Sequence, residues 1–510
     1  MSSQDQEKKN KERIEIEDAN QEVRDSSEVQ KPVHPWKLLK SLNRTQYITF
    51  IAAFLGWTLD AFDFFIVSFA LPYIANEFNK KPSEIASSIT VTLMLRPVGA
   101  LIFGQLADRY GRKYPLMFDI LLYSVVELAS GFSPNFEVFI ILRGIFGIAM
   151  GGEWGLGAAL AMEVLPPEAR ILQQGYATGY LIAAVFYYIV IVNLGWRAMF
   201  WIGSFPAFII ILFRFFVPES PMWERQHANE KASGKNWWTE VKSVFTCHWI
   251  RIIHTVCLMA CFNFISHGTQ DLYPTFLKTQ LHLSAGEITL TLVIANIGAI
   301  IGGTLFGFYS QYWGRRRAIV IAAFLAGCFL PLFVLPRNRW VLSFGAFMVY
   351  FFVQGAWGVV PAHLNELSPP DFRGTFPGLT YQLGNLIAAS SSQIEASLGE
   401  KFPQNGEPDY GLTQAIFVAC ALVLLIFFVS IGKEAKGIDL SAETFHERET
   451  DVDPTGETQV GLSKEVQIEK AKADPLGVTQ VDLSEVQAEK AKEVDPKEEA
   501  LAIEKTHVDS

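Results

Sequence analysis

The sequence predicts an all-α membrane protein, with twelve transmembrane helices arranged as two pseudo-symmetric six-helix bundles. Hydrophobic residues make up 50% of the 510 positions, and the mean hydropathy is positive, a balance that water-soluble chains of this length do not show. Twelve apolar segments, each close to the ~20 residues that a helix needs to cross a bilayer, follow one another along the chain. Polar motifs of the first half return in the second half with the same internal spacing.

The spans divide evenly about a polar connection at 218–250. We place the first bundle at 47–217 and the second at 251–431. The tails at 1–46 and 432–510 are rich in charge and poor in large apolar residues, which predicts disorder. The predicted spans are 47–70, 86–106, 114–132, 136–160, 172–193, 197–217, 252–276, 288–309, 318–336, 340–362, 376–398 and 411–431.

The net charge of −10 comes from the C-terminal tail. Residues 439–510 hold 19 acidic and 8 basic side chains, so the rest of the chain is almost neutral. Basic residues cluster instead in two short loops, 109–113 after the second span and 315–317 after the eighth. Because short loops rich in Lys and Arg stay in the cytoplasm, both loops, the 218–250 connection and both chain ends are predicted to be cytoplasmic.

The tail repeats itself with a period of 21 residues, from Asp453 and again from Asp474. It is either a duplicated solvated segment or a docking segment for turnover or trafficking factors that bind the tail.

Two pairs of motifs show that the membrane body is duplicated. The segment from Gly104 to Lys113 returns 203 residues later, from Gly307, with the same spacing of glycines and basic residues. Glu163-Val-Leu-Pro-Pro likewise returns as Glu366-Leu-Ser-Pro-Pro. In proteins built from such repeats, the binding site lies near the middle of the bilayer between the halves.

A polar stripe runs through the seventh span, in FNFISHGTQDLYPTF at 262–276. Its members are Asn263, Ser266, His267, Gln270 and Asp271, whose spacings of three, four, seven and eight residues fall on one helical face. A His and an Asp facing hydrocarbon would each cost several kcal/mol, so such residues line a cavity, pair, or carry protons and substrates. We expect the stripe to line an aqueous cavity, with His267 and Asp271 sharing a proton.

Charged and amide side chains in other spans complete the candidate site. Arg96, in the middle of span two, could clamp a carboxylate through its guanidinium, or it could form a packing ion pair with Asp60 or Asp63 of span one. Asp60 and Asp63 are also second-choice proton sites, because apolar surroundings favour the protonated form of an acid. Span eleven contains two amides, Gln382 and Asn385. They could donate to carboxylate oxygens, or they could only bond neighbouring helices.

The loop after span two resembles the GxxxDRxGRK signature of the major facilitator superfamily, and the likeness extends over about residues 47–431. The resemblance implies a latch at this loop that holds an outward-open state. Its residues would be Gly104, Asp108, Arg109, Gly111, Arg112 and, from span four, Arg143. In the second half Gln311 replaces the acid, so we expect a weaker latch there. The plain alternative is an arginine cluster that only fixes topology.

The stripe resembles the signature of the fungal Jen-type carboxylate:proton symporters, in the form Asn263-x-x-Ser266-His267-x-Thr269-Gln270-Asp271-x-x-x-Thr275. The resemblance implies import of lactate, pyruvate, succinate or malate with protons across the plasma membrane. Asn263, His267 and Asp271 would contact the substrate and couple the proton, and the resemblance also points to Arg96 and the segment around Gln382 and Asn385.

The sequence holds no phosphate-binding loop, metal cluster or nucleophile elbow. We therefore expect neither an enzyme nor a nucleic-acid partner, and no metal or cofactor. Two rival functions are a transport-inactive carboxylate receptor that signals through its tails and a symporter for another organic anion, such as an aromatic acid or sialate, or for a sugar.

The entrance to span five is shorter than its counterpart in span eleven. Gln174 follows Arg170 by four positions, whereas Gln382 follows Arg373 by nine. Three explanations stay open: a tight loop, a defective protein or an incorrect gene model.

Overall fold

The computed structural model describes residues 43–164, 174–215, 219, 246, 248–368, 376–404, 406–432 and 434. Regular structure in these residues is helical, apart from one isolated bridge between Gln404 and Glu407. The predictions for the two tails, for the tail repeats and for almost all of the 218–250 connection concern residues outside this part of the chain. The short entrance to span five lies outside it as well.

The first half comprises six spans. They are α3 (Arg44–Glu77), α4 (Pro82–Tyr110), α5 (Lys113–Ser130), α6 (Phe136–Val164), a fifth span made of α7 (Gln174–Phe186), the π-helical η2 (Tyr187–Ile191) and α8 (Val192–Leu194), and α9 (Trp196–Phe215).

The second half repeats this order. Its spans are α12 (Trp249–Gln270) continued by α13 (Tyr273–Thr279), α14 (Ala285–Trp313), α15 (Arg315–Val334), α16 (Arg339–Leu367), α17 (Phe376–Ala388) continued by α18 (Ser391–Lys401), and α19 (Tyr410–Ile431).

Nine helical stretches among the described residues are long and apolar enough to cross a membrane. The three other predicted spans are α5, α6 and the α17–α18 segment. α5 carries three charged side chains, the side chains of the second part of α6 lie outside the described residues, and span eleven is interrupted at 389–390. The described helices account for the twelve predicted spans.

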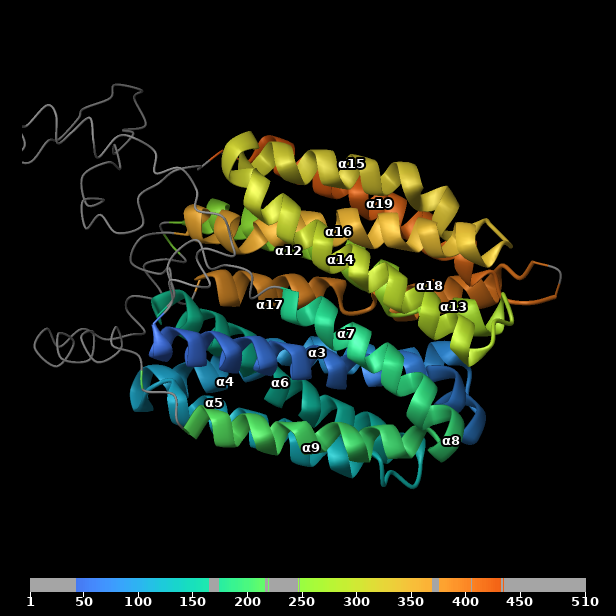
Figure 1. The fold of residues 1–510 in the computed structure, drawn as a ribbon, viewed down its shortest axis with the longest axis horizontal. Coiled ribbons are helices and arrows are strands. Elements are labelled where there is room, and N and C mark those ends of the chain that lie inside the picture. The colour runs from blue at the N-terminus through green and yellow to red at the C-terminus, as the bar shows by residue number, and fades with distance from the viewer. Residues whose placement is uncertain are drawn as a thin grey trace, which may run out of the picture. The chain divides into compact units, whose positions relative to one another are not determined.

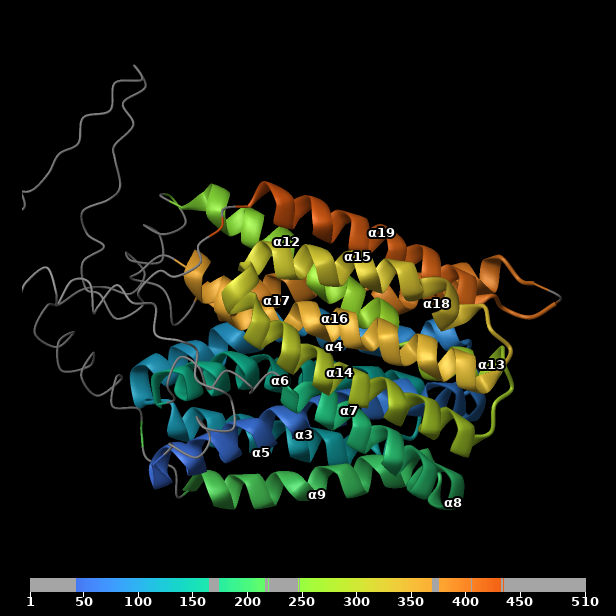
Figure 2. The ribbon, with the colours of Figure 1, turned by 45° about the horizontal axis from the view of Figure 1, so that its top comes forward.

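All of the spans run along the long axis of the bundle (Figure 1). The first six form one group and the last six another, and the two groups stay apart in the turned view (Figure 2). Each half sets its second span against the fifth span of the other half, because α4 packs on α17 and α18 while α14 packs on α7. This reciprocal contact is the pseudo-two-fold relation that the duplicated motifs predict.

The bundle has two different ends. We call the end with the loops from α4 to α5 and from α14 to α15 the arginine end, and the opposite one the far end. The far end holds the short connections at 78–81, 280–284 and 402–409, on the right in Figure 1.

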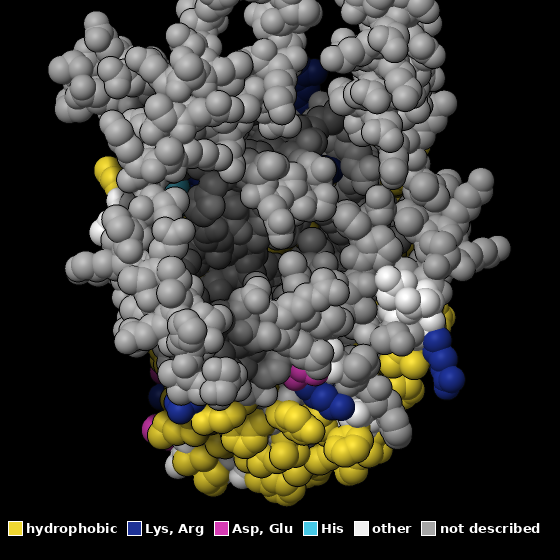
Figure 3. All heavy atoms as spheres, turned by 90° about the vertical axis from the view of Figure 1, so that its left-hand side faces the viewer, with side chains coloured by type: hydrophobic (Ala, Val, Ile, Leu, Met, Phe, Trp, Pro, Cys, Tyr) yellow, Lys and Arg dark blue, Asp and Glu magenta, His cyan; other side chains and the backbone are white. Residues whose placement is uncertain are grey.

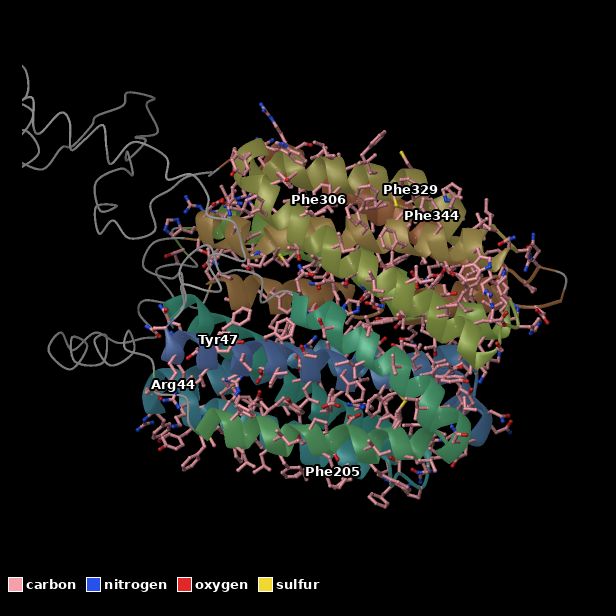
Figure 4. The ribbon with its side chains drawn as sticks, in the orientation of Figure 1. Arg44, Tyr47, Phe205, Phe306, Phe329 and Phe344 are labelled. Carbon is pink, nitrogen blue, oxygen red and sulfur yellow. The ribbon has the colours of Figure 1, made fainter. Side chains whose placement is uncertain are left out.

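Hydrophobic side chains cover the outer face over α5 and α9. Figure 3 looks along the spans from the arginine end, and its lower edge is a continuous hydrophobic surface. Phe205 of α9 is 65% exposed and lies at the lower edge of Figure 4, and Phe118 of α5 is 56% exposed. Phe306 is instead buried, with its ring centroid 6.0 Å from that of Phe352. An exposed apolar belt of this extent fits a surface that lipid covers.

Candidate functional site

The polar stripe of span seven lies on α12 and faces the interior. Asn263, His267 and Asp271 are 2%, 3% and 1% exposed, and Ser266 and Gln270 are buried as well. α12 ends at Gln270, and α13 begins after a short break. Asp271 therefore sits at an interruption of the span, the kind of place where transporters position polar groups.

The prediction that the stripe lines an open aqueous cavity is wrong for this conformation. The ring of Phe64, on α3 of the first half, meets the His267 ring edge-on with centroids 5.7 Å apart. The hydroxyl of Tyr180, on α7, donates to the backbone oxygen of Gln270 at 3.2 Å. Groups of the opposite half thus close over the stripe, which lies in an occluded interface between the halves.

His267 and Asp271 form a buried hydrogen-bonded pair. The Nδ1 atom of His267 lies 3.0 Å from Oδ2 of Asp271, and its Nε2 lies 3.4 Å from Oδ1 of Asn385. Each ring nitrogen of His267 thus faces one side-chain oxygen, and the sharing of one proton between His267 and Asp271 stays a prediction.

Two amides of α17 continue this chain of hydrogen bonds into the first half. Nδ2 of Asn385 donates to Oε1 of Gln382 at 3.4 Å, and Nε2 of Gln382 donates to the backbone oxygen of Gly151 on α6 at 3.1 Å. Gln382 thus bonds a neighbouring helix, as one interpretation from the sequence expects, and its role as a donor to a carboxylate stays a prediction. Asn385 contacts His267 directly.

Arg96 forms an ion pair with Asp60, which is one of the two roles predicted for it from the sequence. Its Nη2 lies 3.2 Å from Oδ2 of Asp60, and both side chains are almost completely buried. A Cβ atom on Gly151 would overlap the carbonyl oxygen of Arg96, so the glycine lets α6 close on α4 at this level. The Nε of Arg96 has no hydrogen-bond partner among the described residues. The guanidinium thus retains a donor for another anion.

The remaining candidates are buried without complete hydrogen bonding. Neither carboxyl oxygen of Asp63 has a partner among the described residues, and the Nδ2 of Asn263 has none either. An unpaired carboxylate in such a place costs several kcal/mol, so Asp63 is a group that favours its proton. No cluster of three or more His, Cys, Asp or Glu positioned for a metal ion occurs in the described part of the chain.

Sequence reasoning missed the aromatic residues that join the two parts of the site. Besides its contact with His267, the Phe64 ring has the Arg96 Cζ 6.0 Å from its centroid. The Tyr381 hydroxyl is a hydrogen-bonding neighbour of Arg96 and of Asn385. Aromatic residues are common in spans, so these two gave no signal beyond the position of Tyr381 next to Gln382.

The predicted latch residues lie at the arginine end, with one exception. Gly104 and Arg109 belong to the end of α4, and Gly111 closes the helix with a φ of 90°. Arg112 stands at the start of α5. The side chain of Asp108 is outside the described residues. Gly111 gives the loop its turn through this positive φ. The latching role of these residues stays a prediction.

Arg143 is the exception, and its assignment to the latch is wrong. α6 begins at the far end with Phe136, so Arg143 lies in its second turn, about 30 Å from the arginine end of the helix. Its Nη1 bonds Oε2 of Glu127 on α5 at 2.8 Å, and its Cζ lies 3.8 Å from the ring centroid of Phe146. Arg143 therefore closes a buried ion pair inside the first half.

The arginine loop of the second half keeps an acidic partner although Gln311 replaces the signature acid. The guanidinium of Arg315 bonds Glu366 of α16 through Nε at 3.2 Å and Nη2 at 3.0 Å. Its Nη1 also donates to Ser310 Oγ at 2.6 Å. The loop of the second half is therefore held by an ion pair, and the expectation that its latch is weaker than that of the first half stays a prediction.

Contacts between the halves close the far end. The backbone N–H and the hydroxyl of Ser83, at the start of α4, donate to the carboxylate of Glu400 on α18 at 3.0 and 2.8 Å. The Nζ of Lys278, on α13, lies 3.0 Å from the ring centroid of Tyr73 on α3. The candidate site is thus shut off from the far end.

Two six-span halves that enclose a buried polar site define a membrane transporter, not an enzyme. The Major Facilitator Superfamily model matches residues 47–392, and also 256–436. The chain belongs to this superfamily.

Similar proteins include transporters of organic acids. A carboxylic acid transporter protein homolog of Saccharomyces cerevisiae is 32% identical over 442 residues, which are 80% of this chain and 72% of that protein. The sialic acid transporter NanX of Escherichia coli is 28% identical, over 77% of this chain and 96% of its own. The cis,cis-muconate transport protein of Acinetobacter baylyi is also 28% identical, over 70% and 86%.

Solved structures share the fold. The xylose transporter XylE from E. coli, in a partially occluded inward-open conformation, aligns with a TM-score of 0.62 at 17% identity, over 78% of this chain and all of that one.

Proposed function

We propose that the protein is a proton-coupled symporter that imports short-chain carboxylates, such as lactate, pyruvate, succinate or malate, across the plasma membrane. It works by alternating access, with both termini and the arginine end in the cytoplasm, and needs no cofactor beyond the proton gradient. The observation that carries the proposal is the hydrogen bond between His267 and Asp271 at the interface of the halves. This pair is joined to Arg96 through Phe64, Asn385 and Tyr381.

Charge balance supplies the coupling. An incoming carboxylate would bind the Arg96 guanidinium, which already faces the carboxylate of Asp60 at 3.2 Å. Two carboxylates on one buried cation leave one negative charge uncompensated, which is costly in an apolar interior. A proton on Asp60, or on neighbouring Asp63, removes that charge. Proton and anion are therefore favoured together, and each is disfavoured alone.

The donors around His267 suit a carboxylate. The Asn263 and Asn385 amides and the Arg96 guanidinium offer N–H groups, and charge-assisted hydrogen bonds to a carboxylate are the strong ones. The names of the relatives support an acidic cargo, since they refer to carboxylic acid, sialic acid and muconate. The sugar-transporter likeness concerns the fold alone.

The occluded site supports alternating access. The far end is closed while the site is buried, so release requires the arginine end to open. With one proton per monocarboxylate the cargo is electroneutral, and the pH difference, not the voltage, drives accumulation. Uptake should therefore fall as the external pH rises.

Uptake of labelled lactate and succinate at pH 5 and pH 7, in cells lacking other acid carriers, tests the proposal. We expect accumulation at pH 5 that falls several-fold at pH 7 and is lost in His267→Asn. His282 is the matched control, because it is an exposed histidine that also meets a carboxylate, Glu407, at 3.2 Å. His282→Asn should behave as the wild type. Binding without accumulation would favour the receptor, and unchanged uptake in His267→Asn would refute the coupling role.

A further inference from the structure

Glu395 is a buried acid that the site described above does not use. It lies on α18, is 0% exposed, and neither of its carboxyl oxygens has a hydrogen-bond partner among the described residues. A carboxylate without a cation or donor in an apolar interior is strongly disfavoured, and such a group takes up a proton instead. Glu395 therefore holds a proton in this conformation.

The position of Glu395 connects it with the stripe. Its Oε1 lies 3.0 Å from the place that a Cβ atom would occupy on Gly268, the residue that follows His267. The same glycine faces Phe417 and Val418 of α19. Glu395 thus fills the junction of α12, α18 and α19, where only a residue without a side chain lets the acid reach α12.

Other polar atoms at this junction also lack partners. Both amide atoms of Gln414, on α19, are buried and unbonded among the described residues, as are Oδ1 of Asp271 and Oγ of Ser392. Gly399 of α18 packs against Tyr410 of α19, so in these antiparallel helices Glu395 and Gln414 come to the same level. The junction thus offers carboxyl, amide and hydroxyl oxygens that can accept a hydrogen bond from a protonated acid.

Among the residues that the structure describes, Asp271 of α12 is the charged group that acts on Glu395 electrostatically. On α19 the neutral Gln414 lies at its level, and on α4 Thr90 bonds Gln393 and Ser83 bonds Glu400. Because Asp271 also bonds His267, a charge on Glu395 acts on the His267–Asp271 pair through that acid.

We propose that Glu395 is a second proton-binding site, lying between the far end and the His267–Asp271 pair and exchanging its proton with that pair. This inference rests on the proposed proton symport. When Glu395 gives its proton to the pair, it becomes a carboxylate, and it regains a proton from water when the far end opens. α18 reaches the far end at Lys401, only about 9 Å along the helix from Glu395, so the route is short.

Glu395→Gln tests the site because glutamine keeps the shape of the protonated acid and cannot release a proton. In proteoliposomes we expect accumulation driven by a pH gradient to fall at least tenfold. Exchange of labelled for unlabelled acid, which needs no net proton movement, should stay within threefold of the wild type. Glu395→Asp should recover part of the accumulation. Glu407→Gln, at an exposed acid of the same end, is the control and should change neither.

Three results would overturn the proposal: normal accumulation in Glu395→Gln, equal loss of exchange and accumulation in both Glu395→Gln and Glu395→Asp, or wild-type uptake that requires sodium and disappears when choline replaces it.

Infrared difference spectroscopy tests the proton site at Glu395 separately from the proposed symport of carboxylates. The band of protonated carboxyl groups should lose intensity in purified Glu395→Gln, whatever the protein transports. An unchanged band would refute the proton site. A reduced band in a protein that moves no carboxylate would leave the site standing and refute the proposed function.

Discussion

Glu219, after span six, and Glu434, after span twelve, hold the same place in the two halves. Each carboxylate accepts two backbone N–H groups at the start of the third span of its half, at 2.9 and 3.2 Å for Glu219 and 2.9 and 3.1 Å for Glu434. Each adjoining loop turns on a glycine of positive φ, Gly111 and Gly314. An anion is favoured at a helix N-terminus, so the duplicated motif is also a helix-capping device within each half.

Removing either cap should weaken its half to a similar degree. Glu219→Gln and Glu434→Gln each lose a charge-assisted cap, for which we expect about 1 kcal/mol. Thermal unfolding of the detergent-purified protein should then shift down by a few degrees in both variants. Glu407→Gln, which caps no helix, should leave the transition in place. A shift in only one variant would contradict the equivalence of the two caps.

Gly151 positions Arg96 by letting two helices touch. Gly151→Ala would place a methyl group against the backbone of α4, and such overpacking costs about 1–3 kcal/mol. Gly327, in α15, has only one ordinary contact at 3.7 Å, so Gly327→Ala should be neutral or stabilising. We expect Gly151→Ala to lower both the yield of folded protein and carboxylate uptake. Equal behaviour of the two variants in size-exclusion chromatography and uptake would refute this account of α4 and α6.

The pair of Glu127 and Arg143 should behave as one buried unit. Glu127→Gln leaves the guanidinium without its carboxylate, and losing one partner of a buried pair costs about 3–5 kcal/mol. The double variant Glu127→Gln/Arg143→Gln removes both charges and should be more stable than Glu127→Gln alone. Thermal unfolding of the wild type, of Glu127→Gln, of Arg143→Gln and of the double variant measures the coupling.

The exposed pair of Lys80 and Glu84, at 3.2 Å, is the control for this experiment. Glu84→Gln should leave thermal unfolding unchanged, because exposed ion pairs contribute little. A double variant no more stable than Glu127→Gln would show that the buried pair is not the reason for the loss.

Much of this fold follows from the sequence. Span lengths and the motif pair beginning at Gly104 and Gly307 predict twelve helices in two related halves, and helical period places His267 and Asp271 on one face. These are local properties, because they depend on the spacing of residues within one helix or between two copies of a motif.

The contacts between helices could not be predicted from the sequence. That Phe64 lies between Arg96 and His267, and that Asp60 rather than Asp63 meets Arg96, depends on packing among three helices. Occlusion of the site is likewise a property of how the halves meet. The sequence alone excludes Arg143 from the latch. An even-numbered span starts at the far end, and its first turns cannot reach the arginine loop.

The far-end contact between Ser83 and Glu400 should set how often that end opens. It joins the halves through two hydrogen bonds to one carboxylate, and it must break whenever the site opens outward. Glu400→Ala removes both bonds while leaving the interior untouched, so the closed state loses stability and the open state does not. Because the contact is only partly buried, we expect a population shift of roughly threefold to tenfold.

A cysteine at Thr289 reports this shift. The Thr289 hydroxyl donates to the backbone oxygen of Ala184 across the halves at 3.0 Å, so a thiol there is shielded while the far end is closed. In a background without the native cysteines, Thr289→Cys should react with a membrane-impermeant maleimide several-fold faster when combined with Glu400→Ala. Glu407→Gln removes a carboxylate from the same end without touching the first half, so it should leave the labelling rate unchanged. Equal labelling rates with and without Glu400→Ala would mean that other contacts hold the far end closed. The next residue to replace would then be Lys278, whose Nζ lies 3.0 Å from the ring centroid of Tyr73.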